Sequence, residues 1–382
     1  MKVKFRDKWE PYLIAVVNKD IGGFKAAALR AAFRVLSYVY GGVVRLRVVL
    51  YRHKILRSKS FGCLVISVGN LTVGGTGKTP VVEMIARRLI EGGRRVAILS
   101  RGYRSKKIKN EKQKTKEKEE FPRVVSDGVN VLMEAEYAGD EPYMLAKDLP
   151  RAVVLVDKNR VRAARYAIKK FKADTILLDD GYQYLRLNRQ VNIVLIDCTN
   201  PFGRHRLLPR GILREPVKNL DRANIFILTK TKGMDLYALK RKLNAVNDKA
   251  DIIQTTHTPK YLNDIYSGTK KDLLWLAGKR IACVSGIASP GGFEKLLGDL
   301  GAVVVSSHRF PDHHSYTEEE IREVIKCAQT QNAQALLTTE KDAVRFPKID
   351  VQRDFPLYYL RVEIEILSGA KEFYDKIGRM CY

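Results

Sequence analysis

The chain has 382 residues, of which 45% are hydrophobic, and a formal net charge of +27. This composition excludes a mainly disordered or fibrous protein, and the length allows one large core or two ordinary ones. The excess charge calls for a polyanionic partner, which could be nucleic acid, anionic lipid or a phosphorylated substrate. The cysteines are scattered without a CxxC pair, so we expect reduced thiols rather than disulfides or a zinc site. They are Cys63, Cys198, Cys283, Cys327 and Cys381.

Residues 1–60 are both basic and apolar, with fourteen Lys and Arg against three Asp and Glu. This combination favours a membrane surface. No signal peptide is expected, because Asn18, Lys19 and Asp20 interrupt the apolar stretches after the basic opening. Residues 26–50 come close to spanning length, but their four arginines would be costly in hydrocarbon. We expect an interfacial helix there, with a helix packed on the protein's own core as the alternative.

Short apolar runs alternate with helical patterns along most of the chain. The run 64–68 predicts a buried strand, and 80–89 predicts the helix that follows a glycine-rich turn. Further strands are expected at 96–99, 153–156, 175–178, 193–196, 225–228 and 281–285, and RVRAARYAIKKF predicts a helix. This rhythm predicts an α/β fold of the P-loop NTPase type, a parallel sheet with helices on both faces.

Two polar stretches interrupt the alternation. Residues 105–120 are rich in Lys and Glu and predict a solvated loop or frayed helix inserted in the core domain. Residues 251–280 look rich in turns, and more α/β alternation follows them. We therefore expect a membrane-interface segment at 1–60, a core domain at 61–255 and a smaller C-terminal α/β domain at 256–382.

The sequence TVGGTGKTP follows the first predicted strand and opens a helix, which is the context of a phosphate-binding loop. Its backbone N–H groups would hold phosphate oxygens, Lys78 would contact the β- and γ-phosphates, and the Thr79 hydroxyl would bind Mg²⁺. Thr72 stands where the usual pattern has a glycine, but Gly74 and Gly75 can supply the flexible backbone. The predicted nucleotide-binding residues are Thr72, Val73, Gly74, Gly75, Thr76, Gly77, Lys78 and Thr79.

Asp179 and Asp180 come at the end of a predicted buried strand. Open α/β sheets bind ligands at that end of their strands, and paired acids beside a phosphate loop suit a Mg²⁺ site. The alternative is a turn in which an aspartate caps the next segment. With the phosphate loop upstream, we favour the metal site.

The stretch SVGNLTVGGTGKTP resembles the extended phosphate loop of the tetraacyldisaccharide 4′-kinases. Six more motifs of that family occur in the same order: SRGY, GDEP, LDDGYQ, LLPRGILREP, FPDHHSY and TEKDAVR. The resemblance covers residues 67–345. It implies an enzyme that uses ATP and Mg²⁺ to phosphorylate the 4′-hydroxyl of a tetraacylated glucosamine disaccharide 1-phosphate, the lipid A precursor. It also implies work on a membrane-embedded substrate, at the cytoplasmic face of the inner membrane of a Gram-negative-type bacterium.

The same resemblance implies roles for individual residues. Asp140 in GDEP is expected to be the catalytic base, and His313 in FPDHH its dyad partner, chosen over His314 by its position in the motif. Glu215 is expected to be a further carboxylate on the Mg²⁺ side. Arginines that could neutralise phosphate charge are Arg101, Arg206, Arg210 and Arg214. Tyr182 and Tyr184 replace the Phe and His that the family often carries, which removes an imidazole from that site.

Two other classes of function are open on the residues alone. A P-loop GTPase, or another membrane-associated NTPase, would share the phosphate loop. Thr229-Lys230-Thr231-Lys232 has lysine where a guanine-reading element needs aspartate. A basic lipid- or RNA-binding module without catalysis would explain the charge but not the loop or the paired aspartates. We expect no nucleic acid and no obligate protein partner.

Overall fold

The computed structural model describes residues 12, 15–17, 21–102, 121–347, 349 and 355–379. The predicted insertion at 105–120 lies outside the described residues. The chain divides into two compact units, each built from two segments: unit 1 comprises 1–77 and 180–254, and unit 2 comprises 78–179 and 255–382. The three-part division expected from the sequence stays a prediction. None of the four described cysteines is in a disulfide.

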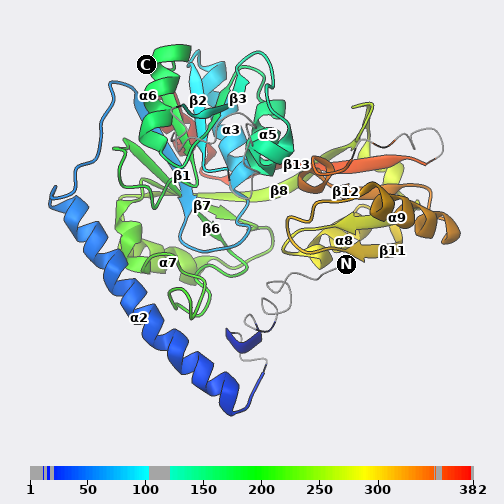
Figure 1. Ribbon diagram of the computed structural model, residues 1–382, viewed down its shortest axis with the longest axis horizontal. Helices are drawn as coiled ribbons and strands as arrows, with labels where there is room; N and C mark the ends of the chain where they lie inside the picture. The colour runs from blue at the N-terminus through cyan, green and yellow to red at the C-terminus, as the bar shows by residue number, and fades with distance from the viewer. Residues whose placement is uncertain are drawn as a thin grey trace, which may run out of the picture. The chain divides into compact units, whose positions relative to one another are not determined.

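Unit 1 is built on parallel strands in the order β8-β7-β6-β1 (Figure 1). The strands are β1 (Leu64–Asn70), β6 (Val191–Asp197), β7 (Ile225–Thr229) and the start of β8 (Asp251–Asp264). The short helix η1 (Val217–Arg222) and α7 (Tyr237–Val246) cover one face of β6 and β7. Their Leu220 and Leu243 are buried against Phe226 and Leu228, which closes the core of this unit.

The predicted helix at 26–50 is confirmed as α2 (Phe24–Arg52), the long blue helix in Figure 1. Its inner face packs on unit 1: Ser37 donates to the Leu207 carbonyl at 3.0 Å. Gly41 lets Leu207 approach, since a Cβ at Gly41 would lie 2.7 Å from Leu207 Cδ1. No helix in the described part of the chain combines the length and the apolar character needed to cross a membrane.

The first segment of unit 2 forms strands in the order β5-β2-β4-β3, with β3 antiparallel to β4 and the other pairs parallel. These strands are β2 (Val96–Ser100), β3 (Arg123–Asp127), β4 (Val153–Val156) and β5 (Thr175–Asp179). The helices are α3 (Lys78–Glu91), α4 (Ala135–Ala138), α5 (Asp140–Asp148) and α6 (Arg160–Phe171). Helix α6 begins where the Asn159 side chain accepts from the Arg162 backbone N–H, as an N-cap should.

The second segment of unit 2 adds the strand order β11-β10-β12-β13 followed by β8, which β9 pairs antiparallel. The strands are β9 (Lys270–Lys271), β10 (Arg280–Ser285), β11 (Val303–Arg309), β12 (Leu336–Thr339) and β13 (Leu357–Ser368). The helices are η2 (Leu273–Leu276), α8 (Pro290–Asp299), α9 (Glu318–Thr330), α10 (Glu340–Ala343) and α11 (Ala370–Arg379).

Alternate residues of β10 enter two separate cores. Ala282 and Val284 pack with the helix α9, while Ile281 and Cys283 pack with α8. A strand that buries both faces reads as a continuous apolar run, which is how 281–285 was predicted. Helices on both faces of a mostly parallel sheet confirm the predicted α/β class in this part of the chain.

The expectation of a turn-rich stretch at 251–280 is wrong for its first half. Residues 251–264 form β8, a strand of 14 residues. Its sequence is polar, but Ile253 and Thr255 are fully buried and Leu262 is buried further along. Ladder pairing with β7 satisfies the backbone, so neighbouring strands, which the local sequence does not contain, decide the conformation.

Arg361, at 4% exposure, is the centre of a buried ion cluster in unit 2. Its guanidinium contacts Glu83 of α3, Asp148 at the end of α5 and Glu340 at the start of α10, with Nη–O distances of 2.5, 2.9 and 2.8 Å. With Glu363, whose Oε1 lies 3.6 Å from Arg361 Nε, four carboxylates face one arginine. Burial, together with the neighbouring Asp148 carboxylate, raises the pKa of Glu340 from 4.5 to about 7.

We expect stability to depend on pH through Glu340. Its folded pKa is above its unfolded pKa, so its stabilising contribution is complete below pH ~4.5 and is lost as the pH rises through about 7. Glu340→Gln stays neutral. As the pH rises from 5 to 8, the free energy of unfolding of the wild type should therefore fall by roughly 2 kcal/mol relative to that of the variant, measured by denaturant titration. The exposed Glu323→Gln on α9 is the control, and parallel stability curves for Glu340→Gln and wild type would contradict the assignment.

Candidate active site

The predicted phosphate loop follows β1 in unit 1 and ends where α3 begins, at Lys78. Gly74 and Gly77 have φ angles of +109° and +76°, which favour glycine at both positions. The start of the loop is fixed by the LLPRGILREP segment: Thr72 forms an antiparallel bridge with Leu213, and the Val73 N–H donates to the Ile212 carbonyl at 2.8 Å. The loop is therefore held by main-chain pairing.

Helix α3 carries Lys78 and Thr79 as its first two residues, and both are half-buried. Its first turn contains no acidic residue. A helix N-terminus with a lysine and exposed N–H groups favours an anion. This arrangement suits the predicted role of residues 72–79 in binding nucleotide phosphates, which stays a prediction.

The end of β1 is packed tightly against the LDDGYQ segment. A Cβ at Gly69 would lie 2.7 Å from Tyr182 Cβ and 2.8 Å from its backbone nitrogen. Tyr182 is fully buried, and its hydroxyl donates to the Asn219 carbonyl, while the Arg222 guanidinium lies 4.5 Å from its ring centroid. Burial raises the pKa of Tyr182 well above its ordinary value. The hydroxyl that distinguishes Tyr182 from the Phe often found in the family is thus hydrogen-bonded to the Asn219 carbonyl.

We predict that Gly69→Ala destabilises the protein by about 1 to 3 kcal/mol, because the added methyl overlaps backbone as well as side-chain atoms of Tyr182. The matched control is Gly62→Ala, where a Cβ meets nothing within 4 Å. Thermal unfolding of both variants tests this. Equal melting temperatures for the two would show that β1 can shift away from Tyr182.

The two paired aspartates lie in different surroundings. Asp179 is the last residue of β5 in unit 2; it is 2% exposed and accepts from the Ser100 hydroxyl at 3.1 Å. Asp180 follows it in unit 1 with φ of +51°, and Nη1 of Arg214 donates to both of its oxygens at 2.8 Å. The predicted phosphate-neutralising Arg214 is thus engaged by a carboxylate here.

Glu215, another predicted metal ligand, is 3% exposed in unit 1. Both of its hydrogen bonds, from Asn219 and from Arg222, fall on Oε2. Within the described ranges, no three Asp, Glu, His or Cys side chains come together in a geometry that could hold a metal. Carboxylate and hydroxyl oxygens are nevertheless the ligands Mg²⁺ prefers, so the donor chemistry of Thr79, Asp179 and Asp180 fits that ion.

Of the remaining arginines that the sequence singled out, Arg101 and Arg206 are exposed and Arg210 is half-buried. Arg101 is exposed at the end of a described stretch. In unit 1, Arg210 donates to the Arg30 carbonyl of α2 at 3.0 Å. Burial, together with repulsion from Arg206 and from the α2 arginines, lowers the pKa of Arg210. Arg206 and Arg210 thus lie beside Arg30 and Arg34 of α2, the helix predicted to meet the membrane.

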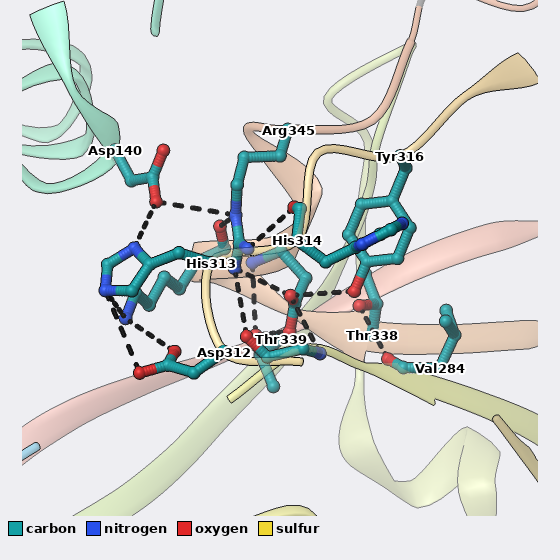
Figure 2. Close-up of polar contacts among 12 residues, drawn as sticks. Asp140, Val284, Asp312, His313, His314, Tyr316, Thr338, Thr339 and Arg345 are labelled. Carbon is teal, nitrogen blue, oxygen red and sulfur yellow. Dashed lines mark hydrogen bonds and ion pairs between the residues drawn. The ribbon is translucent and has the colours of Figure 1, made fainter. Parts of the chain in front are cut away.

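Asp140 and His313 come together in unit 2 although 173 residues separate them (Figure 2). Asp140 is the first residue of α5, after Gly139 with φ of +92°. His313 lies in the loop between β11 and α9 with φ of +63°. Its backbone N–H donates to the Gly286 carbonyl. The distance between His313 Nδ1 and Asp140 Oδ2 is 2.9 Å.

The structure separates the two adjacent histidines. His314 turns to a different carboxylate, with its Nε2 2.8 Å from Glu320 Oε2, and its ring stacks on Phe310 with centroids 4.6 Å apart. Glu320 is also part of the capping box that begins α9 with Thr317. His314 is thus occupied in fixing the loop and helix that present His313.

Two cations beside the Asp140–His313 pair were not singled out from the sequence. Arg345 Nε lies 3.5 Å from Asp140 Oδ2, and Lys341 Nζ lies 3.1 Å from His313 Nε2. Both belong to TEKDAVR, which the sequence analysis used only as a family motif. The signal available in the sequence was that this family motif contains a lysine and an arginine to which no role had been assigned.

Arg345 is fixed by a buried carboxylate, Asp342, with zero exposure. Arg345 Nη2 donates to Asp342 Oδ1 at 2.7 Å, and the same oxygen accepts from the Tyr316 hydroxyl at 2.9 Å and the Gly286 N–H at 3.0 Å. Burial, then the Asp342 charge, raises the pKa of Tyr316 well above its ordinary value, so it stays a donor. Figure 2 shows the Arg345 guanidinium with Asp140 on one side and Tyr316 on the other.

The predicted phosphate loop after a strand of an α/β sheet, and a carboxylate held by a histidine, suit the class of nucleotide-dependent phosphotransferases. The family described as tetraacyldisaccharide-1-P 4′-kinase matches residues 29–381. The tetraacyldisaccharide 4′-kinase of Halothermothrix orenii is 35% identical, over 99% of this chain and 100% of that protein. That of Anaeromyxobacter sp. (strain Fw109-5) is 38% identical, over 93% and 94%. The solved structure of LpxK from Aquifex aeolicus in complex with ATP has a TM-score of 0.73 and 29% identity, over 93% of this chain and 100% of that one.

The chain therefore belongs to the tetraacyldisaccharide-1-phosphate 4′-kinase family. Its activity is the ATP-dependent phosphorylation of the lipid A precursor, with Mg²⁺ as the metal cofactor. The family resemblance seen in the sequence is confirmed. The GTPase and the non-catalytic binding module are set aside.

Proposed function

We propose that the chain transfers the γ-phosphate of ATP to the 4′-hydroxyl of a tetraacylated glucosamine disaccharide 1-phosphate, with Asp140 as the base. The observation that carries this proposal is the way Asp140 is held. Among the described residues, its contacts from His313 and Arg345 both fall on Oδ2. Oδ1 is then the oxygen that accepts the hydroxyl proton.

The reaction balances with these groups. As the sugar oxygen bonds to the γ-phosphorus, the bond from phosphorus to the β–γ bridging oxygen breaks, ADP leaves, and the hydroxyl proton passes to Asp140 Oδ1. Residues 72–77 and Lys78 bind the nucleotide phosphates through backbone N–H groups and the ammonium. Thr79, Asp179 and Asp180 are the residues that would hold Mg²⁺, and the ion would supply charge neutralisation at the phosphates. Glu215 is a further candidate carboxylate, with its contacts from Asn219 and Arg222 on Oε2.

We expect Asp140→Asn to lower the rate of phosphate transfer by at least ~10²-fold while leaving ATP affinity nearly unchanged, because the amide cannot accept the proton. Lys78→Ala should also abolish transfer, through weakened phosphate binding. The measurement is radiolabelled ATP transfer to the disaccharide in micelles, with ATP binding by calorimetry. Wild-type turnover in Asp140→Asn would exclude Asp140 as the base.

The substrate carries several acyl chains, each worth about 0.8 kcal/mol per buried methylene, so the enzyme must reach it at the membrane surface. Helix α2 supports such a location. Its exposed apolar residues follow helical spacing along one face: Val35, Val39, Val43, Leu46 and Val49, each 46–62% exposed. We name this set the α2 apolar stripe. We propose that the stripe enters the lipid interface while the helix arginines contact anionic head groups at the cytoplasmic face.

A triple variant, Val39→Ser, Val43→Ser and Leu46→Ser, tests this location. These side chains face away from the unit 1 contacts of α2, so the fold should be kept. Each lost insertion removes on the order of 1 kcal/mol, so binding to anionic vesicles should fall at least ~100-fold in a sedimentation assay. The control replaces the exposed Val129 and Leu274, which are 80% and 83% exposed and belong to other elements. Equal loss in the control, or none in the triple variant, would count against the stripe.

A further inference from the structure

The imidazole of His313 is contacted on both nitrogens. Nδ1 lies 2.9 Å from Asp140 Oδ2, and Nε2 lies 3.1 Å from Lys341 Nζ. Lys341 Nζ also lies 3.3 Å from Asp312 Oδ1, and Asp312 Oδ2 lies 3.8 Å from His313 Nε2, so this carboxylate faces both the ammonium and the imidazole. Asp140, His313, Lys341 and Asp312 thus form one continuous polar chain.

The direction of hydrogen bonding along this chain follows from the chemistry of its members. A lysine ammonium has three donors and no acceptor, so Nε2 of His313 must accept from it. A neutral imidazole carries one N–H, and with Nε2 accepting, that proton is on Nδ1. Nδ1 then donates to the carboxylate of Asp140. The opposite tautomer would set an N–H against the ammonium and a lone pair against the carboxylate.

We propose that Lys341 is a positioning residue for phosphate transfer: its ammonium fixes the Nδ1–H tautomer of His313, which holds Asp140 by Oδ2 and leaves Oδ1 to the substrate. This inference rests on the proposed role of Asp140 as the base. Lys341 acts through His313 and does not itself touch the reacting atoms.

Lys341 is itself held in place within unit 2. It belongs to α10, which begins where the Thr339 hydroxyl accepts from the Asp342 N–H at 3.1 Å. The preceding residue, Glu340, is bound to Arg361. The Lys341 side chain is 25% exposed. A lysine on an unanchored loop would sample many positions. Lys341 instead belongs to a capped helical turn, between Glu340 and Asp342, which are each bound to an arginine.

The test measures the tautomer and the rate separately. In protein labelled with ¹⁵N-histidine, the two ring nitrogens give distinct shifts. Among the signals of the six histidines, those of His313 are identified by their loss in His313→Ala. Wild-type His313 should be protonated on Nδ1. Lys341→Met should populate the Nε2–H form and lower kcat roughly tenfold, with KM for ATP and for the lipid unchanged. Lys341→Arg, which keeps a donor, should restore both the tautomer and most of kcat.

The matched control is Lys326→Met, an exposed lysine of α9, which should change neither signal. A wild-type His313 protonated on Nε2 overturns the proposal without any variant. So does Lys341→Met with an unchanged tautomer, or with a changed tautomer and unchanged kcat. Because the ¹⁵N measurement needs no substrate, failure of Asp140 as the base would appear in the transfer assay alone and remain distinguishable.

Discussion

The hydrogen bond between His313 Nδ1 and Asp140 Oδ2 is the interaction on which our account depends. It joins the first residue of α5 to a loop 173 residues later, so it exists only when both chain segments of unit 2 have folded together. Helix α5 is held at both ends, by His313 at Asp140 and by Arg361 at Asp148. The backbone that carries the base is therefore fixed along its length, as positioning catalysis requires.

Buried charge in unit 2 is arranged in two linked groups. Arg361 joins α3, α5 and α10 through three carboxylates, and Asp342 fixes Arg345 beside Asp140. Both groups meet at α10, where Glu340 faces Arg361 and Lys341 faces His313. Breaking a buried pair by removing one partner commonly costs several kcal/mol, so changes far from Asp140 should still disturb the base. Unit 1 has a different kind of contact: main-chain pairing holds the predicted phosphate loop, and one face of α2 packs on this unit.

The sequence located seven strands because they are continuous apolar runs: β1, β2, β4, β5, β6, β7 and β10. It did not locate β3, β9, β11, β12 or β13 individually. It failed at β8, where polar residues are held by neighbouring strands. The phosphate loop could be predicted because its motif is local in the chain, and its role stays a prediction. The arrangement around Asp140 could not, since no local pattern joins GDEP to FPDHH and TEKDAVR, and only family resemblance singled out His313. Lys341 and Arg345 needed coordinates, because their importance lies in what they touch.

A double-mutant cycle on the rate of phosphate transfer tests the central claim most directly. His313→Ala alone should lower kcat substantially, because Asp140 loses its donor. In the Asp140→Asn background, the same His313→Ala change should cost almost nothing, since the histidine acts only through the carboxylate. Strong non-additivity is the predicted result. Independent, additive losses would contradict the account, because they would mean that the two residues do not act as one unit.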